Sequence, residues 1–568
     1  MPPASPNLAT TTIPAYEALA LDIKNLGIEA VFGLMSDDTA LLLASLDAAG
    51  VRVFGARHEN NACAMAEGYA ASTGRVGIVI VGRGPGAANA MHGMTYAQRT
   101  GSRVLMIVGE MSNEPGAPNA IGPDAKEFDA SLALRSASIR TYTATDSQTV
   151  RRTLAQAVAA TRDGAVALLL PSNVQFGMIN PDTTAPGAIA TATTACPAAR
   201  AGAIDAAAAL LAKSRKPLVI AGYGAYAAGA RDPIVGFADH IGAALGTTAK
   251  AKDMFRGHPF DCGVIGSFSN AGGRRLIEQA DCVVAFGAGL NLRTMSFGLS
   301  LPPGIPIIQV DRTRNNIGRW FHSDVGIVAD AGEAAVRLRE ALPARPAADQ
   351  PLRGDTLRRW LADFDPASDF VAMPTARTLD PRTVGVELDK LLPAARNVVY
   401  DAGNFLSILP YLSVPGPGHW KLAADFASIG MGFGTAMGYA CAKPDLTTVL
   451  VVGDGGFLMT MSELETVARE DIPLVIVLMN DAAYGAELHY LKMRDTPDGL
   501  AQFPDIDYAP VAAAFGFQTA TVRTLDELRS LAPMLAKPEG PILIDVKING
   551  AVAAPFMSEA VEYERRRA

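Results

Sequence analysis

The sequence predicts an α/β protein of three consecutive domains, each built on a mainly parallel β-sheet. The chain has 568 residues, a length that suits three domains of ordinary size. Short apolar runs rich in β-branched residues alternate with Ala- and Leu-rich helical patterns, which is typical of α/β units. Two stretches of linker-like composition, Asn180 to Ala199 and Leu342 to about Arg377, divide this alternation into three blocks.

The three blocks predict domains at residues 12–180, 198–342 and 378–550, followed by a charged tail at 551–568. The apolar runs expected as buried strands lie at residues 30–34, 76–82, 103–109, 165–171, 216–224, 281–289, 305–311, 397–403, 448–456, 473–481 and 541–548. The first block also holds two expected helices, at 16–26 and 60–72.

The composition excludes several classes of protein. Hydrophobic residues make up 49% and charged residues 19%, with a net charge of −8 and no Lys/Arg block, so we expect neither nucleic-acid nor membrane-surface binding. No apolar run reaches the roughly 18 residues of a membrane span, and the N-terminus lacks a signal-peptide pattern. Five scattered cysteines without CxxC pairing argue against a zinc cluster or disulfide framework, and favour a cytoplasmic enzyme.

The most informative segment runs from Val449 to Gly485, where two predicted buried strands frame a helix. The first strand ends in the turn Gly453–Gly456 and the second in Asn480-Asp481. Strand ends of a parallel sheet share one edge, so Asp454 and Asp481 can converge there. Two carboxylates can hold Mg²⁺, and the N–H groups of the turn can hold diphosphate oxygens. For Gly-Asp-Gly alone, an ordinary βαβ turn would be the favoured reading.

With the following Ala-Tyr-Gly, this segment resembles the signature of thiamine-diphosphate enzymes of the acetolactate synthase, benzaldehyde lyase and pyruvate decarboxylase type. The resemblance implies an N-terminal pyrimidine-binding domain, a Rossmann-like central domain and a C-terminal diphosphate-binding domain. It also implies that Asp454 and Asp481 ligate Mg²⁺ by side chain and Ala483 by its carbonyl. Asp481 stands where the signature has Asn, and a carboxylate is an equally good oxygen ligand. The resemblance further implies diphosphate contacts at Gly453, Gly455, Gly456, Tyr484 and Gly485.

Two other segments of the third block carry the same resemblance. Residues 428–440 resemble the family segment that passes beneath the cofactor. This implies that Met431 lies under the bend between the two cofactor rings and that the Ile429 carbonyl accepts from the pyrimidine amino group. Ordinary core packing is the alternative for a methionine. Asn404, in the turn that starts at Asp401, is implied to contact the diphosphate.

Glu59 is the candidate for the acid that activates the cofactor. It follows the strand-like residues 51–56 and opens a helical pattern with an apolar face, where its carboxylate would be partly withdrawn from water. Taken alone, Glu59 is more simply read as a helix-start residue that favours the dipole. However, the pattern HE-xx-A-xxx-AEGYA from His58 resembles the family segment that carries the activating glutamate.

That resemblance implies a mechanism and an assembly. Glu59 would hydrogen-bond a ring nitrogen of the aminopyrimidine and so promote loss of the thiazolium C2 proton. In the family, this glutamate and the diphosphate motif meet across a subunit interface. We therefore expect at least a homodimer, with a homotetramer common, and a small carbonyl compound as the substrate.

The middle block contains a weaker motif. Residues 222–227 match GxGxxA after a predicted strand, and Asp311 ends another strand, as in a dinucleotide-binding domain. The acid expected about twenty residues after the glycines is missing. In the family this domain holds FAD, an ADP group or nothing. For this sequence, a domain without FAD is favoured over one that binds FAD.

Departures from the family pattern supply the substrate candidates. Ser36 and Asp37 stand where many members have Pro-Gly-Gly. Lys126 and Glu127 stand where acetolactate synthases have Phe and Gln. Lys126 is expected to pair with Glu127 or, slightly less favoured, with a substrate carboxylate.

Glu487 falls where pyruvate decarboxylases carry a second catalytic glutamate, but their paired histidines have no counterpart in the first block. His92 and His489 are the nearest imidazoles worth testing, although a lone histidine is more often structural. The leading hypothesis is therefore a carboligase or lyase acting on a 2-oxo acid or 2-hydroxy ketone. A 2-oxo acid decarboxylase is second, and a non-catalytic nucleotide-binding paralogue is disfavoured because Glu59, Asp454 and Asp481 are intact.

Overall fold

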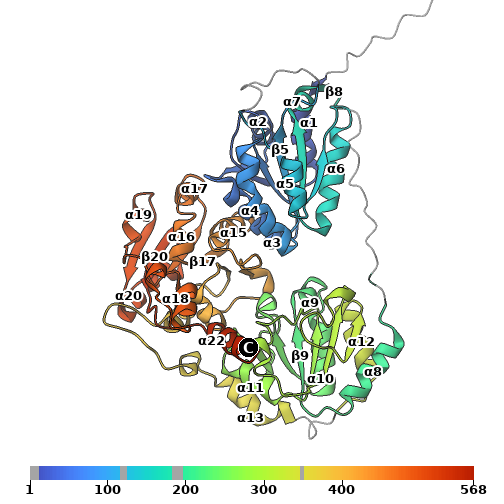
Figure 1. Ribbon diagram of the computed structural model, residues 1–568, viewed down its shortest axis with the longest axis vertical. Helices are drawn as coiled ribbons and strands as arrows, with labels where there is room; N and C mark the ends of the chain where they lie inside the picture. Colours follow the sequence, from blue (N-terminus) through green and yellow to red (C-terminus); the bar gives the residue numbers. More distant parts are fainter. Residues whose placement is uncertain (1–11, 115–124, 182–195, 197, 346–350, 568) are drawn as a thin grey trace, which may run out of the picture.

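The computed structural model describes residues 12–114, 125–181, 196, 198–345 and 351–567, and these form three α/β domains (Figure 1). Each domain contains one six-stranded sheet in which every strand pairing is parallel. The predicted fold class is thereby confirmed. The strands of each sheet fall inside one of the three expected ranges, while most of the stretch from Asn180 to Ala199 lies outside the described residues.

The N-terminal sheet has the order β3-β2-β4-β5-β7-β6. Its strands are β2 (Ala30–Gly33), β3 (Arg52–Gly55), β4 (Gly77–Val81), β5 (Val104–Glu110), β6 (Arg140–Thr143) and β7 (Val166–Pro171). One face is covered by α1 (Ala15–Asn25), α2 (Ala40–Ala48), α6 (Val150–Ala160) and α7 (Ser172–Phe176). The other is covered by α3 (Glu59–Thr73), α4 (Pro85–Thr100) and α5 (Ala130–Ser136). A small antiparallel pair, β1 (Ile13–Pro14) and β8 (Met178–Ile179), lies beside it.

The central sheet has the order β11-β10-β9-β12-β13-β14. Its strands are β9 (Pro217–Ala221), β10 (Ala244–Thr247), β11 (Asp261–Val264), β12 (Cys282–Phe286), β13 (Ile307–Asp311) and β14 (Val325–Val328). One face packs on α8 (Ala201–Leu211), α9 (Tyr223–Ala227), α10 (Arg231–Ile241) and α12 (Ala331–Glu340). The other packs on α11 (Ala271–Gln279) and on α13 (Asp355–Ala362), a helix within the stretch expected only to separate two domains.

The C-terminal sheet has the order β16-β15-β17-β18-β20-β19. Its strands are β15 (Arg396–Tyr400), β16 (Trp420–Leu422), β17 (Thr447–Gly453), β18 (Leu474–Asn480), β19 (Gln518–Val522) and β20 (Ile542–Lys547). Its helices are α14 (Pro381–Leu391), α15 (Met431–Ala442), α16 (Asp454–Leu458), α17 (Glu463–Arg469), α18 (Gly485–Lys492), α19 (Ala509–Ala513), α20 (Leu525–Ser530), α21 (Ala532–Ala536) and α22 (Pro555–Arg565). Strands β17 and β18 are almost wholly buried because helices cover both faces of the sheet.

The N- and C-terminal domains share one apolar core where α3 packs along α15 (Figure 1). Glycines allow the two helix backbones to touch. A Cβ atom on Gly68 would lie 2.1 Å from the Thr435 carbonyl oxygen, and one on Gly438 would lie 2.1 Å from the Met65 carbonyl oxygen. The start of α3, where Glu59 lies, is therefore held against the C-terminal domain.

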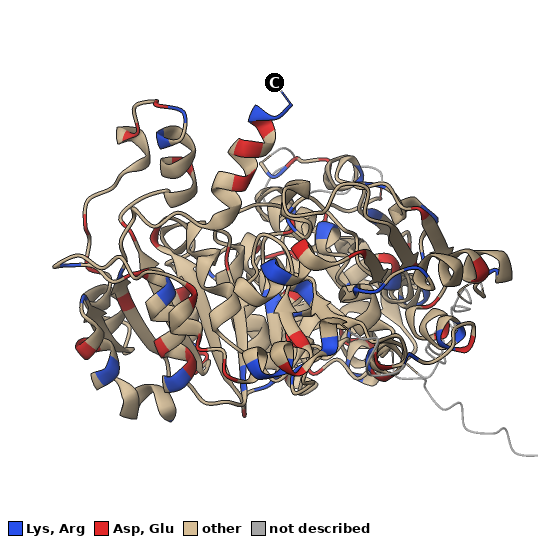
Figure 2. Cartoon of the chain, turned by 90° about the horizontal axis from the view of Figure 1, so that it is seen from below, with Lys and Arg blue, Asp and Glu red and all other residues tan. Residues whose placement is uncertain are grey.

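The prediction of a charged tail at residues 551–568 is wrong. Residues 555–565 form helix α22, whose Phe556 and Met557 side chains are buried in the core of the C-terminal domain. The charged residues that suggested a tail lie on the remainder of the helix, where Figure 2 shows acidic bands followed by a basic end. An apolar side chain at only a few helix positions is enough to anchor it.

Acidic and basic residues are interspersed over all three domains (Figure 2). The described cysteines are all free thiols. Among the described helices, none combines the length and the apolar character needed to span a membrane.

Candidate active site

The turn between β17 and α16 places a carboxylate at the edge of the C-terminal sheet. β17 ends at Gly453, and α16 begins directly with Asp454. Asp454 is 2% exposed, and its Oδ1 atom has no hydrogen-bond partner among the described residues. Burial raises the pKa of Asp454 to about 6. A buried carboxylate oxygen without a partner is costly, which indicates that it serves a ligand.

Asp481 lies beside Asp454, as the sequence predicts. It follows the last residue of β18, and burial together with the neighbouring Asp454 charge raises the pKa of Asp481 well above its usual value. Directly after Asp481, Ala482 adopts a left-handed φ of 54°, a strained conformation that turns the chain at this edge. A divalent cation between the two carboxylates would remove their repulsion, so the residues fit Mg²⁺.

Two glycines at this edge pack directly against carboxylates of the chain. A Cβ atom on Gly456 would lie 2.4 Å from the Asp401 Oδ2 atom, and one on Gly485 would lie 2.4 Å from the Asp481 Oδ2 atom. Any side chain at these positions would displace a carboxylate. The packing of the two carboxylates therefore requires glycine at both positions.

A cavity of about 1020 Å³ opens over this turn and is lined by all three domains. The lining includes seven of the eight predicted cofactor contacts, Met431 being the exception, and all three predicted metal ligands. These residues are Asn404, Ile429, Gly453, Asp454, Gly455, Gly456, Asp481, Ala483, Tyr484 and Gly485. The structure thus brings together residues from β15–α15, β17–α16 and β18–α18 as the parallel topology requires.

Ile429 and Met431 flank a turn that the sequence did not explain. The buried Asp401 carboxylate accepts hydrogen bonds from the Gly430 N–H at 2.6 Å and the Gly432 N–H at 3.1 Å. It thereby caps helix α15. Ile429 lines the cavity, but Met431 is 1% exposed and packs with Ala64, Tyr96 and Ala423. The packing thus favours the alternative that Met431 is an ordinary core residue. Its predicted place beneath the cofactor stays a prediction.

The Asn404 amide is already engaged by the chain. Its Nδ2 atom donates to the Val552 carbonyl oxygen and its Oδ1 atom accepts from the Ala554 N–H, both at 2.8 Å. This holds the start of α22 against the cavity. One amide hydrogen is left to reach a diphosphate, so that predicted contact stays a prediction.

Glu59 is the first residue of α3 and is 8% exposed. The Asn89 side chain donates to its Oε2 atom at 3.0 Å. Glu59 is not among the residues that line the 1020 Å³ cavity of its own chain. Within one chain, the predicted acid and the predicted diphosphate turn are therefore separate.

The comparison with protein families reproduces this division into three parts. Residues 14–124 match the N-terminal TPP binding domain of thiamine pyrophosphate enzymes, 204–338 match their central domain, and 401–546 match their C-terminal TPP binding domain. The chain belongs to the thiamine pyrophosphate enzymes. Thiamine pyrophosphate is the thiamine diphosphate inferred from the sequence, so the expected family is confirmed, and the protein is a thiamine-diphosphate-dependent enzyme.

Curated relatives are similar over most of their length. A protein of Methanocaldococcus jannaschii named as a probable acetolactate synthase large subunit is 26% identical, covering 88% of this chain and 86% of the relative. Sulfoacetaldehyde acetyltransferase of Castellaniella defragrans is 26% identical over 92% and 89% of the two chains. The enzyme of the same name from Rhodobacter capsulatus is 27% identical over 96% of each.

Of the six predicted substrate residues in this thiamine pyrophosphate enzyme, five lie outside the cavity of their own chain: Ser36, Asp37, Lys126, Glu127 and His489. The expected Lys126–Glu127 pair is wrong. Lys126 instead forms an ion pair with Asp37, which also accepts from the Ser36 hydroxyl, while Glu127 is exposed. Lys126 holds the pKa of Asp37 below its usual range. The fold brings these distant residues together, so adjacency in sequence was a poor guide.

The two predicted histidines lie in different surroundings. His92, on α4, lines the cavity, and its Nε2 atom lies 2.5 Å from the Ser428 hydroxyl. Burial lowers the pKa of both His92 and His489. His489 lies on the buried side of α18 and does not line the cavity, whereas the exposed Glu487 on the same helix does.

Arg293 is a cavity residue that the sequence reasoning missed. It lies after β12 in the central domain, and its guanidinium stacks 4.4 Å from the centre of the Phe556 ring. Partial desolvation lowers the pKa of Arg293, whose side chain is still exposed to solvent, and Glu559 is the acid whose charge opposes this. In the described part of the chain, no carboxylate lies within ion-pair distance of its guanidinium. Arg293 follows a glycine-rich loop after a strand, and such a loop has no sequence pattern that would have identified it as a cavity residue.

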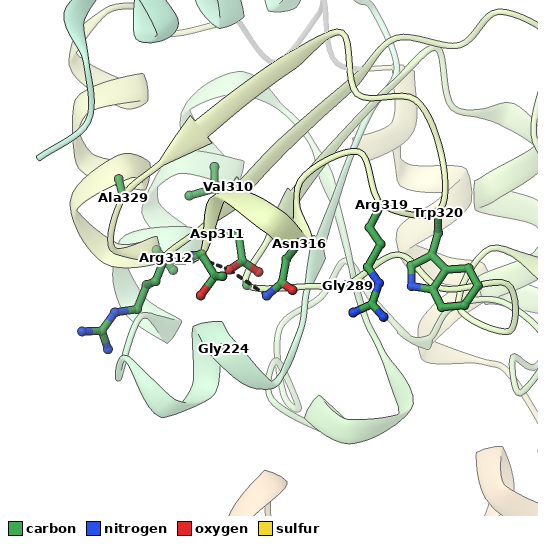
Figure 3. Close-up of a pocket in the computed structure, with 12 residues that line it drawn as sticks. Gly224, Gly289, Val310, Asp311, Arg312, Asn316, Arg319, Trp320 and Ala329 are labelled. Carbon is green, nitrogen blue, oxygen red and sulfur yellow. Dashed lines mark hydrogen bonds between the residues drawn. The ribbon is translucent and has the colours of Figure 1, made fainter. Parts of the chain in front are cut away.

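A second cavity, of about 360 Å³, lies at the central glycine motif (Figure 3). Its lining includes Gly224, Asp311, Asn316 and Trp320. The Asp311 Oδ1 atom accepts from the Thr313 N–H at 2.8 Å and from the Asn316 side chain at 3.1 Å. These contacts leave the FAD or ADP question from the sequence open.

Proposed function

We propose that this thiamine-diphosphate-dependent enzyme is a carboligase or carbon–carbon lyase, acting on a 2-oxo acid or a related acyl compound with an anionic group. The observation that carries this proposal is the cavity that joins the carboxylate pair Asp454 and Asp481 to the exposed guanidinium of Arg293 at its wall. The carboxylate pair fits a metal-bound diphosphate, and the guanidinium fits a carboxylate or sulfonate at the other wall.

The residues of this chain have separate tasks in that reaction. Asp454, Asp481 and the Ala483 carbonyl would hold Mg²⁺, while the N–H groups of Gly455 and Gly456 would hold the diphosphate. When bound, thiamine diphosphate supplies an electron sink for the carbon next to the substrate carbonyl. Glu59 would hold and move a proton at a ring nitrogen of the pyrimidine. Arg293 would orient the substrate by its anionic end.

Two copies of the chain are needed for this arrangement. Glu59 lies outside the lining of its own chain's cavity, so we infer that it serves the cavity of a second copy in a homodimer or larger assembly. The paired residues Asp37 and Lys126 belong to the same domain as Glu59 and would approach the partner's substrate. We place the enzyme in the cytoplasm, because its five cysteines are unpaired.

A 2-oxo acid decarboxylase is the second candidate. It is favoured by Glu487, whose exposed side chain lines the cavity beside the metal turn. A decarboxylase would release an aldehyde from a 2-oxo acid even when no acceptor is supplied. A carboligase would consume the same donor and give a larger hydroxy ketone or acyl product.

Product analysis separates these candidates. The enzyme with thiamine diphosphate and Mg²⁺ is incubated with pyruvate, glyoxylate, sulfoacetaldehyde or neutral benzoin, and products are identified by NMR and mass spectrometry. Carboligase or lyase products support the proposal. Aldehyde and CO₂ as the sole products from every 2-oxo acid would support the decarboxylase, and no reaction with any of the four would contradict both.

Arg293→Met tests the anion site directly. Losing a charged hydrogen-bond partner costs about 10- to 100-fold in binding, so KM should rise by that factor for the anionic substrates used and stay unchanged for benzoin. Lys250→Gln is the matched control, since Lys250 also lines the cavity but is already paired with Asp425 at 2.5 Å. Equal effects of Arg293→Met on charged and neutral substrates would contradict the assignment.

A further inference from the structure

Glu463 is a wholly buried carboxylate that reaches from the C-terminal domain into the N-terminal domain. It begins α17, shortly after the diphosphate turn, and its side chain has 0% exposure. Neither the metal site nor either cavity uses it. A buried charge needs compensating partners, and its partners show what it holds.

Three of those partners belong to the turn that starts α3. The Glu463 carboxylate accepts from the Arg57 N–H at 3.0 and 3.2 Å, from the His58 N–H at 3.1 Å and from the Asn61 Nδ2 atom at 2.9 Å. A fourth donor, the Thr466 hydroxyl, lies 2.6 Å away within α17 itself. Glu463 therefore binds the residues on both sides of Glu59, the first residue of α3.

Among the described residues, no basic side chain lies within ion-pair distance of Glu463, and the start of α3 compensates its charge. The Arg57 guanidinium pairs with Glu465 at the exposed rim of the same contact. The Glu463 carboxylate instead faces backbone N–H groups before a 15-residue helix, where the helix dipole favours an anion. Removing this acceptor would leave two backbone N–H groups and the Asn61 amide without their partner, and the turn would shift.

We propose that Glu463 is a positioning residue that fixes the direction of the Glu59 carboxylate for proton transfer. This inference rests on the proposed role of Glu59 at a cofactor held by a second copy of the chain. Asn89 fixes the same carboxylate from α4, so Glu59 is held between a side chain of its own domain and a clamp from the other domain.

The contact of Glu463 with the start of α3 also connects two sites. Glu463 lies one short helix beyond Asp454, so a single segment of the C-terminal domain carries a metal ligand at one end and holds the Glu59 turn at the other. In the proposed assembly, Glu59 serves the second copy's cavity. Glu463 is therefore a physical contact between the metal turn of one cavity and the acid of the other.

Glu463→Gln tests the inference against a matched control, Glu465→Gln. The glutamine keeps the size but turns one acceptor into a donor that faces N–H groups, while Glu465 contacts the same Arg57 at the rim, where side chains are 30–45% exposed. A misplacement of about 1 Å costs about 100-fold in rate. In the full-length enzyme with cofactor and Mg²⁺, we expect Glu463→Gln to lower kcat and C2 hydrogen–deuterium exchange by about 10- to 100-fold.

The same variant should leave substrate KM and the cofactor dissociation constant within about threefold, because neither binding site touches Glu463. Glu465→Gln should change no quantity by more than about twofold. Combining Glu463→Gln with Glu59→Gln should slow exchange no further than Glu59→Gln alone, since the clamp acts through Glu59. A role confined to packing would instead give additive losses and a fall in cofactor affinity.

Circular dichroism checks that the variants fold. If Glu463→Gln does not fold, Glu463→Asp serves instead, because it keeps the charge but withdraws it by one methylene, and it should slow exchange more than Glu465→Gln does. Wild-type exchange in a folded Glu463 variant overturns the positioning role. Wild-type exchange in Glu59→Gln overturns the proposed function instead, so the two failures are distinguishable.

Discussion

The C-terminal and central domains contain the same local pattern and use it differently. In each, a buried parallel strand ends in a glycine turn that opens a five-residue helix, α16 after β17 and α9 after β9. At the C-terminal turn, the buried Asp454 has an oxygen without a partner. Beside the central turn, Asp311 at the end of β13 lines the same cavity as Gly224, and its carboxylate is satisfied by the Thr313 N–H and the Asn316 side chain.

The glycines also have different neighbours. A Cβ atom on Gly222 would collide with the Gly287 carbonyl oxygen at 2.3 Å, so this glycine serves the packing of two loops. At the C-terminal turn, the close neighbours of Gly456 and Gly485 are carboxylate oxygens of Asp401 and Asp481, and Asp481 lines a large cavity. A glycine turn thus indicates a binding site when the polar groups around it lack partners within the chain.

The largest expected effect is complete loss of turnover on removing both cofactors. The proposed ligands Asp454, Asp481 and the Ala483 carbonyl would hold a divalent cation through oxygen atoms alone, and the cation would in turn anchor the diphosphate. Exhaustive chelation and dialysis should abolish activity, and recovery should require thiamine diphosphate and Mg²⁺ together. Full activity of the stripped protein would show that the C-terminal turn is as structural as the central one.

The second effect concerns the half of the site that the other domain supplies. Glu59→Gln keeps the size and the hydrogen bond from Asn89 but cannot carry a proton to the pyrimidine. We expect turnover and C2 hydrogen–deuterium exchange to fall together by about 10²- to 10⁴-fold. Cofactor affinity, measured by titration calorimetry, should survive because it comes from the C-terminal turn.

The third effect concerns Asp481 and compares two substitutions at this one position. Asp481→Ala removes a metal oxygen and should weaken cofactor binding in the presence of Mg²⁺ by about 10- to 100-fold. Asp481→Asn keeps the oxygen and restores the residue of the family signature, so binding should change little. Calorimetric titration of both variants checks this, and equal affinities of wild type and Asp481→Ala would refute the ligand role.

The smallest effect is expected at the central turn. Asp311→Asn keeps an oxygen that can accept from Thr313 and Asn316, so the free energy of unfolding should change by less than about 1 kcal/mol. Turnover and thiamine diphosphate affinity should stay within about twofold of wild type. A large loss of turnover in a stably folded Asp311→Asn would show that this domain takes part in the reaction.

The central strands of all three sheets were predictable, because a strand buried on both faces is an unbroken apolar run. Several neighbouring or edge strands were not. β6 reads Arg-Thr-Tyr-Thr with exposed ends, and β16 has only three residues, so neither has a pattern that stands out from a loop. Helix α22 was missed for a similar reason, since few of its residues are buried.

The sequence by itself determined the fold class, the family and the local partners at the metal turn, because these depend on strand patterns and on residues close together along the chain. Only the tertiary structure decided that Lys126 pairs with Asp37, that Arg293 and His92 face one cavity, and that Glu463 grips the turn at Glu59. Each of these joins segments from different elements or domains. The sequence does not encode such contacts in any spacing, since packing of whole domains brings the side chains together.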